Sequence, residues 1–269
     1  SQNIKYTYND PERRDSWDFT ISLSITNKNS YLYERFKQRQ NLHDNDFVEI
    51  KIDPSVLLEN ECFFCDTNAA NYTFNEYREN NEKLNTLKDS ISNIHNCELK
   101  KNAANIVFAD GNPKTKIMLI GEGPGSNEDK EGLPFVGRAG ALLDKMLSSI
   151  NLDRKKVYIT NVVNYRPPEN RKPTEEEINR YLPYLKKHIE IISPKILILL
   201  GSTALNALIG SEVVISKARG KWIEKQFGTC KTSVLVTYHP AFLMRQPAQK
   251  KMAWIDLKMI RDQKAKLKI

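Results

Sequence analysis

No stretch of this sequence is apolar over enough residues to cross a membrane. The longest apolar run, Ile196–Leu200 with its flanks, is far shorter than the ~20 residues that a membrane-spanning helix needs. Residues 1–15 mix acidic and basic side chains and contain no apolar core of a signal peptide. We therefore expect a cytoplasmic protein with no membrane partner.

Cysteine is also scarce, with four residues in the chain: Cys62, Cys65, Cys97 and Cys230. A disulfide framework is not expected where no secretion signal is visible. Cys62 and Cys65 have the Cys-x-x-Cys spacing of metal ligands, but a single such pair is a weak signal. The sequence shows no internal repeat and no low-complexity tract.

The chain does contain enough apolar residues for a core, together with an excess of positive charge. It has 269 residues, of which 40% are hydrophobic, and a formal net charge of +8. This length suits one large domain, or a core domain with a smaller partner. Lysine and arginine clusters favour polyanions, because binding releases counterions from phosphates. The same charge is compatible with a solvated basic surface that has no partner.

The first 74 residues differ in pattern from the rest. Apolar and polar residues alternate from Trp17 to Ile25, which predicts a half-buried strand. A helix is expected over 31–42, a strand over 48–52 and a polar linker over 68–73. We therefore predict a small N-terminal α/β extension over residues 1–74 and a larger domain over residues 75–269.

Strands and helices alternate through the larger domain. Strands are predicted over 116–120, 157–163, 195–200 and 233–237, and helices over 75–94, 141–150, 202–209 and 248–264. A further helix opens at Thr174, with a capping box to Glu177. This alternation predicts a parallel sheet covered by helices on both faces, where ligands bind beyond the carboxyl ends of the strands.

The first unusual segment after a strand is Gly-Glu-Gly-Pro-Gly at 121–125, followed by Glu128, Asp129 and Pro-Phe-Val-Gly-Arg-Ala-Gly at 134–140. Glycines here let backbone N–H groups approach a ligand, although a tight turn alone has the same composition. Neither a dinucleotide fingerprint nor a Walker motif is present. Phe135 is unusual as an aromatic in a glycine-rich loop, and its ring could stack on a planar base.

Two more polar residues come at or just after the ends of predicted strands. Asn161 offers a donor and an acceptor together, which suits the edge of a pyrimidine, although such an asparagine is more often a turn cap. His239, before Pro240, can donate a hydrogen bond to charge that develops on a leaving group. A lone histidine at this position is more often structural.

Together these segments resemble the family 4 uracil-DNA glycosylases. The match runs in order from near Cys97 to about Asp262, and includes Thr-Asn-Val-Val at 160–163 and Arg-Pro-Pro-x-Asn-Arg-x-Pro-Thr at 166–174. The resemblance implies a three-layer α/β/α fold with a central four-stranded parallel sheet. It also implies a monofunctional glycosylase that hydrolyses the N-glycosidic bond of a flipped-out deoxyuridine in base excision repair. The partner would be uracil-containing DNA at the nucleoid, and we expect a monomer.

The resemblance also implies roles for individual residues. Phe135 would stack on the uracil, Asn161 would read its Watson–Crick edge, and His239 would stabilise negative charge on its O2. One acid of the first motif would position the attacking water or stabilise the positive charge of the sugar: Glu122, Glu128 or Asp129. The backbone around the base would come from Gly121, Gly123 and Gly125. DNA would be contacted by Arg138, Arg166 and Arg245, with Leu243 or Met244 as the wedge in the duplex.

The sequence departs from the family at the ligands of its four-iron four-sulfur cluster. The positions of the four ligand cysteines read Ile94, Cys97, Tyr165 and Tyr181. We therefore expect the cluster to be absent, with the two tyrosines filling its volume. The alternative is a relocated metal site that uses Cys62, Cys65, Cys97 and Cys230. Residues 166–174 also lack the basic insertion of a covalently acting relative, so covalent trapping of DNA is not expected.

Two other functions stay open at this point. The chain could be a catalytically silent DNA-binding protein that keeps the glycosylase fold and meets a protein partner through its N-terminal extension. It could also be a nucleotide- or metal-binding redox protein, an interpretation based on Cys62, Cys65 and the glycine-rich turn.

Overall fold

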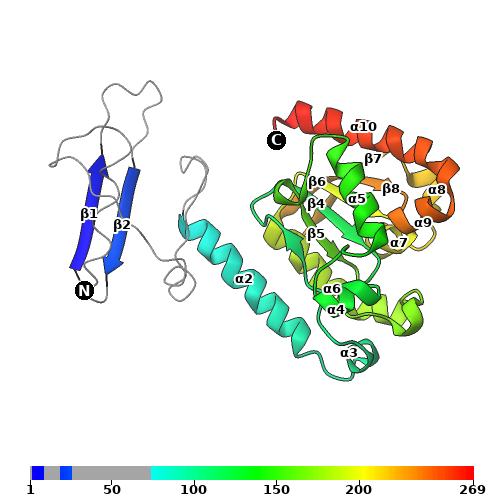
Figure 1. Ribbon diagram of the computed structural model, residues 1–269, viewed down its shortest axis with the longest axis horizontal. Coiled ribbons are helices and arrows are strands. Elements are labelled where there is room, and N and C mark those ends of the chain that lie inside the picture. Colours follow the sequence, from blue (N-terminus) through cyan, green and yellow to red (C-terminus); the bar gives the residue numbers. More distant parts are fainter. Residues whose placement is uncertain (1, 9–18, 26–73) are drawn as a thin grey trace. The chain divides into compact units, whose positions relative to one another are not determined.

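The computed structural model describes residues 2–8, 19–25 and 74–269. The chain divides into two compact units, Ser1–Asn68 and Ala69–Ile269. In the first unit, β1 (Gln2–Tyr8) pairs with β2 (Phe19–Ile25) in an antiparallel two-stranded sheet, drawn in blue in Figure 1. The strand expected from the alternation after Trp17 is thus confirmed as β2, whereas β1 was not expected.

The other elements expected in the N-terminal extension lie outside the described residues. These are the helix over 31–42, the strand over 48–52 and the linker over 68–73. The domain boundary at residue 74 stays a prediction.

The second unit is built on a six-stranded sheet with the strand order β3-β5-β4-β6-β8-β7. Its strands are β3 (Asp110–Gly111), β4 (Ile117–Gly121), β5 (Tyr158–Asn161), β6 (Ile196–Leu200), β7 (Trp222–Phe227) and β8 (Cys230–Thr237). The four central strands are parallel, and β3 and β7 run antiparallel to their neighbours. The predicted four-stranded parallel sheet is therefore confirmed as the centre of the sheet, and β3 and β7 extend it by one antiparallel strand at each edge.

Helices connect these strands. The longer ones are α2 (Phe74–Ser92), α5 (Arg138–Ser148), α6 (Glu175–Ile192) and α10 (Lys250–Leu267). The shorter ones are α3 (Glu98–Asn102), α4 (Ser126–Glu131), α7 (Ser202–Leu208), α8 (Ile215–Ala218) and α9 (Pro240–Arg245). The expected capping box opens α6: Glu177 N–H donates to Thr174 Oγ1 at 3.2 Å, and Thr174 N–H donates to Glu177 Oε2 at 2.7 Å. Among the described residues, no helix is long and apolar enough to span a bilayer.

Successive residues of the buried strands face opposite sides of the sheet, which produces three layers. On β4, Met118 and Ile120 pack into a core shared with α2, α6 and α7, whereas Ile117 and Leu119 pack into a second core shared with α5, α9 and α10. This period of two is the geometry of an extended chain. Since both faces are covered, the central strands β4 and β6 carry no polar side chain, and Figure 1 shows the helices on either side of the sheet. The fold is thus three-layer α/β/α.

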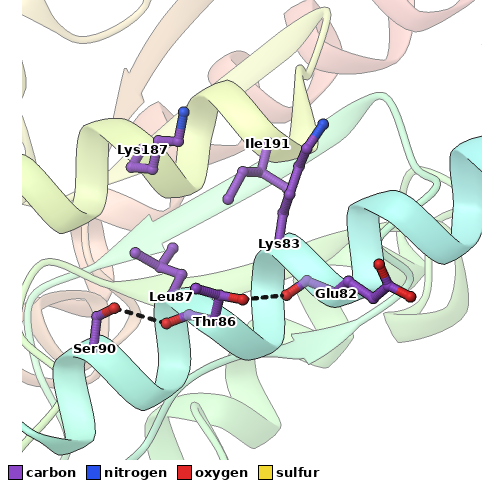
Figure 2. A pocket seen from close by; sticks show the side chains of 7 residues that line it. All are labelled: Glu82, Lys83, Thr86, Leu87, Ser90, Lys187 and Ile191. Carbon is purple, nitrogen blue, oxygen red and sulfur yellow. Dashed lines mark hydrogen bonds between the residues drawn. The ribbon is translucent and has the colours of Figure 1, made fainter.

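Helices α2 and α6 pack together and leave a groove of about 450 Å³ between them. Figure 2 shows Leu87 of α2 and Ile191 of α6 in its wall. The hydroxyls of Thr86 and Ser90 donate to backbone carbonyls one turn earlier in α2, at 2.8 and 2.7 Å. The groove contains none of the predicted site residues.

Candidate active site

A second cavity, of about 170 Å³, lies at the carboxyl ends of the parallel strands. It collects residues from the turn after β4, the end of β5, the loop after β5 and the segment after β8. Its walls are formed by Glu122, Gly123, Pro124, Gly125, Glu128, Phe135, Ala139, Asn161, Pro167, Asn170, Arg171, Pro173, His239 and Ala241. Each of the three predicted motifs therefore contributes to one cavity, at the edge of the sheet where an α/β fold is expected to bind its ligand.

Asn161 is the most deeply buried polar group in this cavity, with 3% of its surface exposed. Its Oδ1 atom has no hydrogen-bond partner among the described residues. An unpaired buried acceptor costs about 1–3 kcal/mol, so its presence in a cavity indicates a ligand N–H that fills the role. Gly121 is paired with Asn161 across β4 and β5, and its lack of a side chain leaves space for the Asn161 amide. A Cβ on Gly121 would lie 2.4 Å from Oδ1.

Phe135 forms one wall of the cavity and is held in an unfavourable backbone conformation. The residue is 5% exposed, and its φ of +56° lies in the left-handed region, which costs a residue with a side chain roughly 1–2 kcal/mol. The Phe135 ring lies near the His239 ring, with centroids 5.5 Å apart and planes tilted by 31°. Gly121 is needed here too, because its Cβ would come within 2.5 Å of Phe135 Cζ.

The His239 ring is neutral at physiological pH. Burial, followed by the positive charge of Arg245, lowers the pKa of His239 to about 4, against an opposing effect of Glu128. Its Nδ1 accepts a hydrogen bond from the backbone N–H of Ala241 at 3.1 Å. An imidazole that accepts at Nδ1 carries its proton on Nε2, so His239 can offer a neutral N–H donor to a ligand.

The three predicted acids have different surroundings. Glu122 lines the cavity, and its Oε2 accepts from the Thr203 hydroxyl. Glu128 also lines the cavity, but both of its oxygens accept from backbone N–H groups, Oε1 from Gly137 at 2.8 Å and Oε2 from Gly125 at 3.1 Å. Glu128 thus ties the turn after β4 to the start of α5.

Asp129, the third predicted acid, lies outside the cavity wall. It is 5% exposed, is not among the residues that line the cavity, and its Oδ1 accepts from the backbone N–H groups of Ala104 and Asn105 at 2.9 and 3.1 Å. The carboxylate therefore anchors the segment before β3, because α4 turns this side chain away from the cavity that Glu128 faces.

The predicted DNA contacts flank the cavity without lining it. Arg138 and Arg245 are exposed, at the start of α5 and the end of α9, and Arg166 donates from Nε to Asn170 Oδ1 at 2.8 Å. Met244 is partly exposed. Leu243, by contrast, is 1% exposed within the core shared with α5 and α10, so this side chain is not placed to enter a duplex, and the wedge stays a prediction for Met244.

Sequence reasoning missed several residues of the cavity wall, of which Asn170 and Arg171 are polar. The loop that carries them turns sharply, since Glu169 and Asn170 both have left-handed backbone, with φ of +54° and +56°. Arg171 is held by both oxygens of Glu177, at 2.8 and 2.6 Å. The signal that could have found them is the Arg-Pro-Pro-x-Asn-Arg segment itself, which begins five positions after Asn161.

The positions of the expected cluster ligands lie together in one core, but they do not fit an iron–sulfur cluster. Cys97, Tyr165 and Tyr181 are buried there with Ile94 packed beside them, and Cys97 Sγ lies 3.2 Å from the Tyr181 hydroxyl. Burial, followed by the bond to Cys97, raises the pKa of Tyr181, and burial raises that of Tyr165, so both phenols are neutral. One thiol among four positions is not a cluster-binding set.

The alternative metal site combines described and undescribed residues. Cys230 is buried at the start of β8 with its Sγ 3.7 Å from the Pro194 carbonyl, while Cys62 and Cys65 lie outside the described residues. Within the described part of the chain, no three His, Cys, Asp or Glu side chains are grouped to hold a metal ion. The relocated site stays a hypothesis.

Comparison with protein families assigns this arrangement to a class. Residues 108–258, more than half of the chain, match the family model described as the uracil DNA glycosylase superfamily. Residues 2–118 match a second family model, described as the ssDNA thymidine ADP-ribosyltransferase DarT. The first match begins just before the edge strand β3 and ends within α10. It contains every residue of the cavity wall.

Individual relatives narrow the class further. The type-4 uracil-DNA glycosylase of Sulfurisphaera tokodaii is 41% identical over 186 residues, which cover 67% of this chain and 84% of the relative. Those of Thermotoga maritima and Archaeoglobus fulgidus are 42% and 39% identical, over 61% and 66% of this chain and 84% and 92% of the relatives. The chain belongs to the type-4 uracil-DNA glycosylases.

Proposed function

We propose that this chain hydrolyses the N-glycosidic bond of a flipped-out deoxyuridine in DNA and releases uracil, as a monofunctional enzyme of base excision repair. The observation that carries the proposal is the unpaired Oδ1 of Asn161, buried in a cavity that also contains Phe135 and His239. The cavity of about 170 Å³ is below the usual ~300–1,000 Å³ of ligand pockets, so a single base suits it better than a nucleotide.

Asn161 would provide the selectivity for uracil. Its Oδ1 would accept from uracil N3–H, and its Nδ2 would donate to uracil O4. Cytosine presents an acceptor at N3 and a donor amine at C4, which reverses both hydrogen bonds and leaves buried polar groups unpaired. A site built on such hydrogen bonds rejects the mismatched analogue strongly.

His239 would stabilise the leaving group. As the glycosidic bond breaks, negative charge develops on the uracil O2. The neutral imidazole can stabilise this charge with a hydrogen bond from Nε2–H, without a change in its own protonation state. Phe135 would stack on the base face and hold the base while the bond breaks. Water then attacks the sugar, so neither a metal nor a covalent protein nucleophile is needed for this step.

Among the acids, we assign the role of positioning water, or stabilising the positive charge of the sugar, to Glu122. Glu128 uses both oxygens on backbone N–H groups, whereas Glu122 has one oxygen bound to Thr203 and lines the cavity. Arg138, Arg166 and Arg245 would bind phosphates beside the cavity. Those contacts, together with Met244 as a wedge, would offset the few kcal/mol that extrusion of a base costs.

The proposed enzyme works without the iron–sulfur cluster. The buried Cys97–Tyr181 contact and Tyr165 occupy the core where the family's ligands would lie, and none of the proposed steps uses a metal. We also propose that it acts as a monomer at the nucleoid.

The match to DarT favours a second activity for the N-terminal part. We propose that this part contacts single-stranded DNA and delivers such substrates to the glycosylase. The partner of the N-terminal part would then be DNA and not a protein. If so, the full chain binds an unpaired strand more tightly than a duplex of the same length, measured by fluorescence anisotropy at several salt concentrations. Equal affinities with equal salt dependence would count against this proposal.

The glycosylase itself is tested with labelled oligonucleotides that carry one uracil, either single-stranded or opposite guanine, followed by alkali. We expect cleavage at the uracil alone, and none in oligonucleotides with cytosine or thymine at that position. Asn161→Ala combined with His239→Ala should lower the rate by at least about 10²-fold. A folded protein that binds DNA but leaves uracil in place would instead support the catalytically silent DNA-binding protein.

A further inference from the structure

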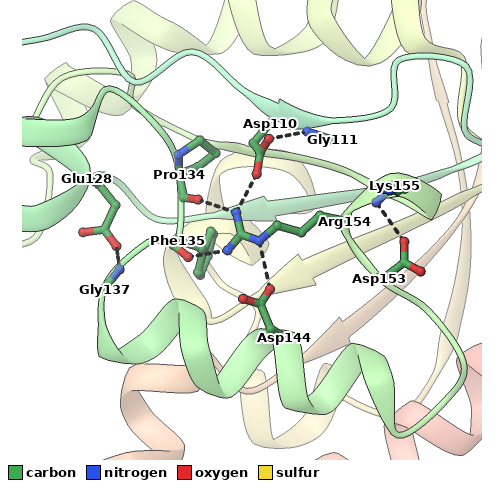
Figure 3. A network of polar contacts seen from close by, with 10 residues as sticks. All are labelled: Asp110, Gly111, Glu128, Pro134, Phe135, Gly137, Asp144, Asp153, Arg154 and Lys155. Carbon is green, nitrogen blue, oxygen red and sulfur yellow. Dashed lines mark hydrogen bonds and ion pairs between the residues drawn. The ribbon is translucent and has the colours of Figure 1, made fainter.

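Arg154 lies outside the cavity but binds the backbone of the loop that carries Phe135. It begins the short 3-10 helix Arg154–Lys156, just before β5. Its guanidinium donates from Nη1 to the Pro134 carbonyl at 3.1 Å and from Nη2 to the Phe135 carbonyl, as Figure 3 shows. Arg154 is not part of the cavity wall, so an effect on the site must pass through this loop.

Two carboxylates from different elements fix the guanidinium. Arg154 Nε donates to Asp144 of α5 at 2.9 Å, and Nη1 also donates to Asp110 of β3 at 2.6 Å (Figure 3). The side chains are 25% exposed for Arg154, 27% for Asp110 and 48% for Asp144. Pairs this exposed contribute little to global stability, whereas hydrogen bonds in several directions fix the plane of the guanidinium.

The Phe135 backbone requires support because its φ of +56° is uncommon for a residue with a side chain. Its carbonyl is also pressed against the start of α5, where a Cβ on Gly140 would lie 1.6 Å from the oxygen. Arg154 and Gly140 thus constrain the same carbonyl, one by a hydrogen bond and the other by close approach. The ring attached to this constrained backbone is a wall of the cavity.

We propose that Arg154 is a positioning residue for uracil excision: it fixes the Pro134–Phe135 segment so that the Phe135 ring is aligned before the base enters. This inference rests on the proposed stacking role of Phe135. Arginine is required because its planar fork reaches two carbonyls and two carboxylates at once, while a lysine ammonium cannot match this geometry. A misplacement of about 1 Å at a reacting site can cost on the order of 10²-fold in rate.

The test is a double-mutant cycle in the full-length protein between Arg154→Gln and Phe135→Ala. The single-turnover rate and the half-saturating DNA concentration are measured on a single-stranded oligonucleotide with one uracil. We expect Arg154→Gln to lower the rate by roughly 10-fold or more, with a smaller change in the DNA concentration needed. In the Phe135→Ala background, the same substitution should cost less than about 3-fold, because the ring that Arg154 positions is gone.

Each outcome decides between the role of Phe135 and that of Arg154. If Phe135→Ala leaves the rate unchanged, the stacking role fails and the inference about Arg154 fails with it. If Phe135→Ala lowers the rate but the two effects multiply, the stacking role stands and only the positioning role is overturned. Should Arg154→Gln not fold, Arg154→Lys and Asp110→Asn perturb the same contacts more mildly and must show the same non-additivity.

A matched control is Arg261→Gln on α10. Arg261 is an exposed arginine whose guanidinium bonds the adjacent Asp262. Its substitution removes one positive charge from the chain but does not touch the Phe135 loop. Its rate should equal that of the parent protein, and a comparable loss there would assign the Arg154 effect to net charge and overturn the inference.

Discussion

The rings of Phe135 and His239 lie 5.5 Å apart, centroid to centroid, with their planes tilted by 31°. They come from segments that are over a hundred residues apart, one before α5 and the other at the start of α9. The rings are tilted against each other and not stacked face to face. The two side chains can therefore act on one base in different ways, the phenylalanine on its face and the histidine on its edge.

Substitution of Asn161 by aspartate should remove one of the two hydrogen bonds that select uracil at the base edge. The change keeps the acceptor Oδ1 but replaces the donor amide by a second acceptor, so the hydrogen bond to uracil O4 is lost and like partners face each other. We expect uracil excision to fall by roughly 10²-fold or more. The rate is measured on the single-uracil oligonucleotide, with parallel assays on cytosine.

Asn151→Asp is the control for this substitution. Asn151 is an exposed turn residue with φ of +58°, a conformation that aspartate also tolerates, and it is not part of the cavity wall. The control should keep the parent rate. An Asn161→Asp variant that excises uracil at the parent rate would show that this amide does not read the base.

The titration of His239 depends on Arg245. The positive charge of Arg245 is one of the causes that lower the pKa of His239 to about 4, after burial. Arg245→Gln removes this charge and makes the imidazolium less unfavourable, so the pKa of His239 should rise. Titration of the His239 ring by NMR measures this change directly. A pKa that stays the same or falls would contradict the proposed electrostatic coupling.

Acid should destabilise the fold through His188. This side chain is 2% exposed, its Nε2 lies 2.8 Å from the Tyr158 hydroxyl, and burial lowers its pKa to about 3. The unfolded chain binds this proton near pH 6.5. The contribution of neutral His188 to the free energy of unfolding is therefore fully present above pH 6.5, and it is lost as pH falls towards 3, by up to ~1.4 kcal/mol per pH unit.

Urea denaturation at several pH values tests the role of His188. In the His188→Gln variant the free energy of unfolding should depend less steeply on pH between 6.5 and 4. His95→Gln, which changes an exposed histidine, should retain the parent slope. An unchanged slope in His188→Gln would show that other groups cause the acid sensitivity.

The contact between Cys97 and Tyr181 should stabilise the core in place of a metal centre. Tyr181→Phe leaves the Cys97 thiol without this partner, and we expect a loss of about 1 kcal/mol in the free energy of unfolding with excision unchanged. Tyr184→Phe, on the same helix and only partly buried, is the control and should cost less.

Iron analysis of the purified protein should find none, whereas about four irons per chain would contradict the proposed loss of the cluster.

The motifs and the central strands could be predicted from the sequence because their signals are local. Apolar runs mark the buried parallel strands, and glycine, asparagine and histidine follow them at the edge where ligands bind. The edge strand β7 escaped prediction because its burial is irregular, and β3 because two residues carry no pattern. Both exist only through pairing with a neighbour.

The sequence also could not show which of two adjacent side chains faces the cavity. Glu128 and Asp129 are both acids of the same short helix, and only tertiary contacts show that one faces the cavity while the other binds Ala104 and Asn105. Arg154 is a stronger case, because it lies 19 residues from Phe135 and no local pattern connects them. Such contacts depend on how the elements pack.

Leu243 and Met244 offer a last prediction in which neighbouring residues have opposite effects. Leu243→Ala opens a cavity in the core and should destabilise the protein by roughly 2–5 kcal/mol, while the folded molecules still excise uracil. Met244→Ala removes a partly exposed side chain and should leave stability nearly unchanged. If Met244 is the wedge, its loss slows excision from a U:G duplex more than from a single strand, since an unpaired base needs less extrusion. The ratio of the two rates is the deciding measurement: equal losses on both substrates would mean that Met244 does not help to open the duplex.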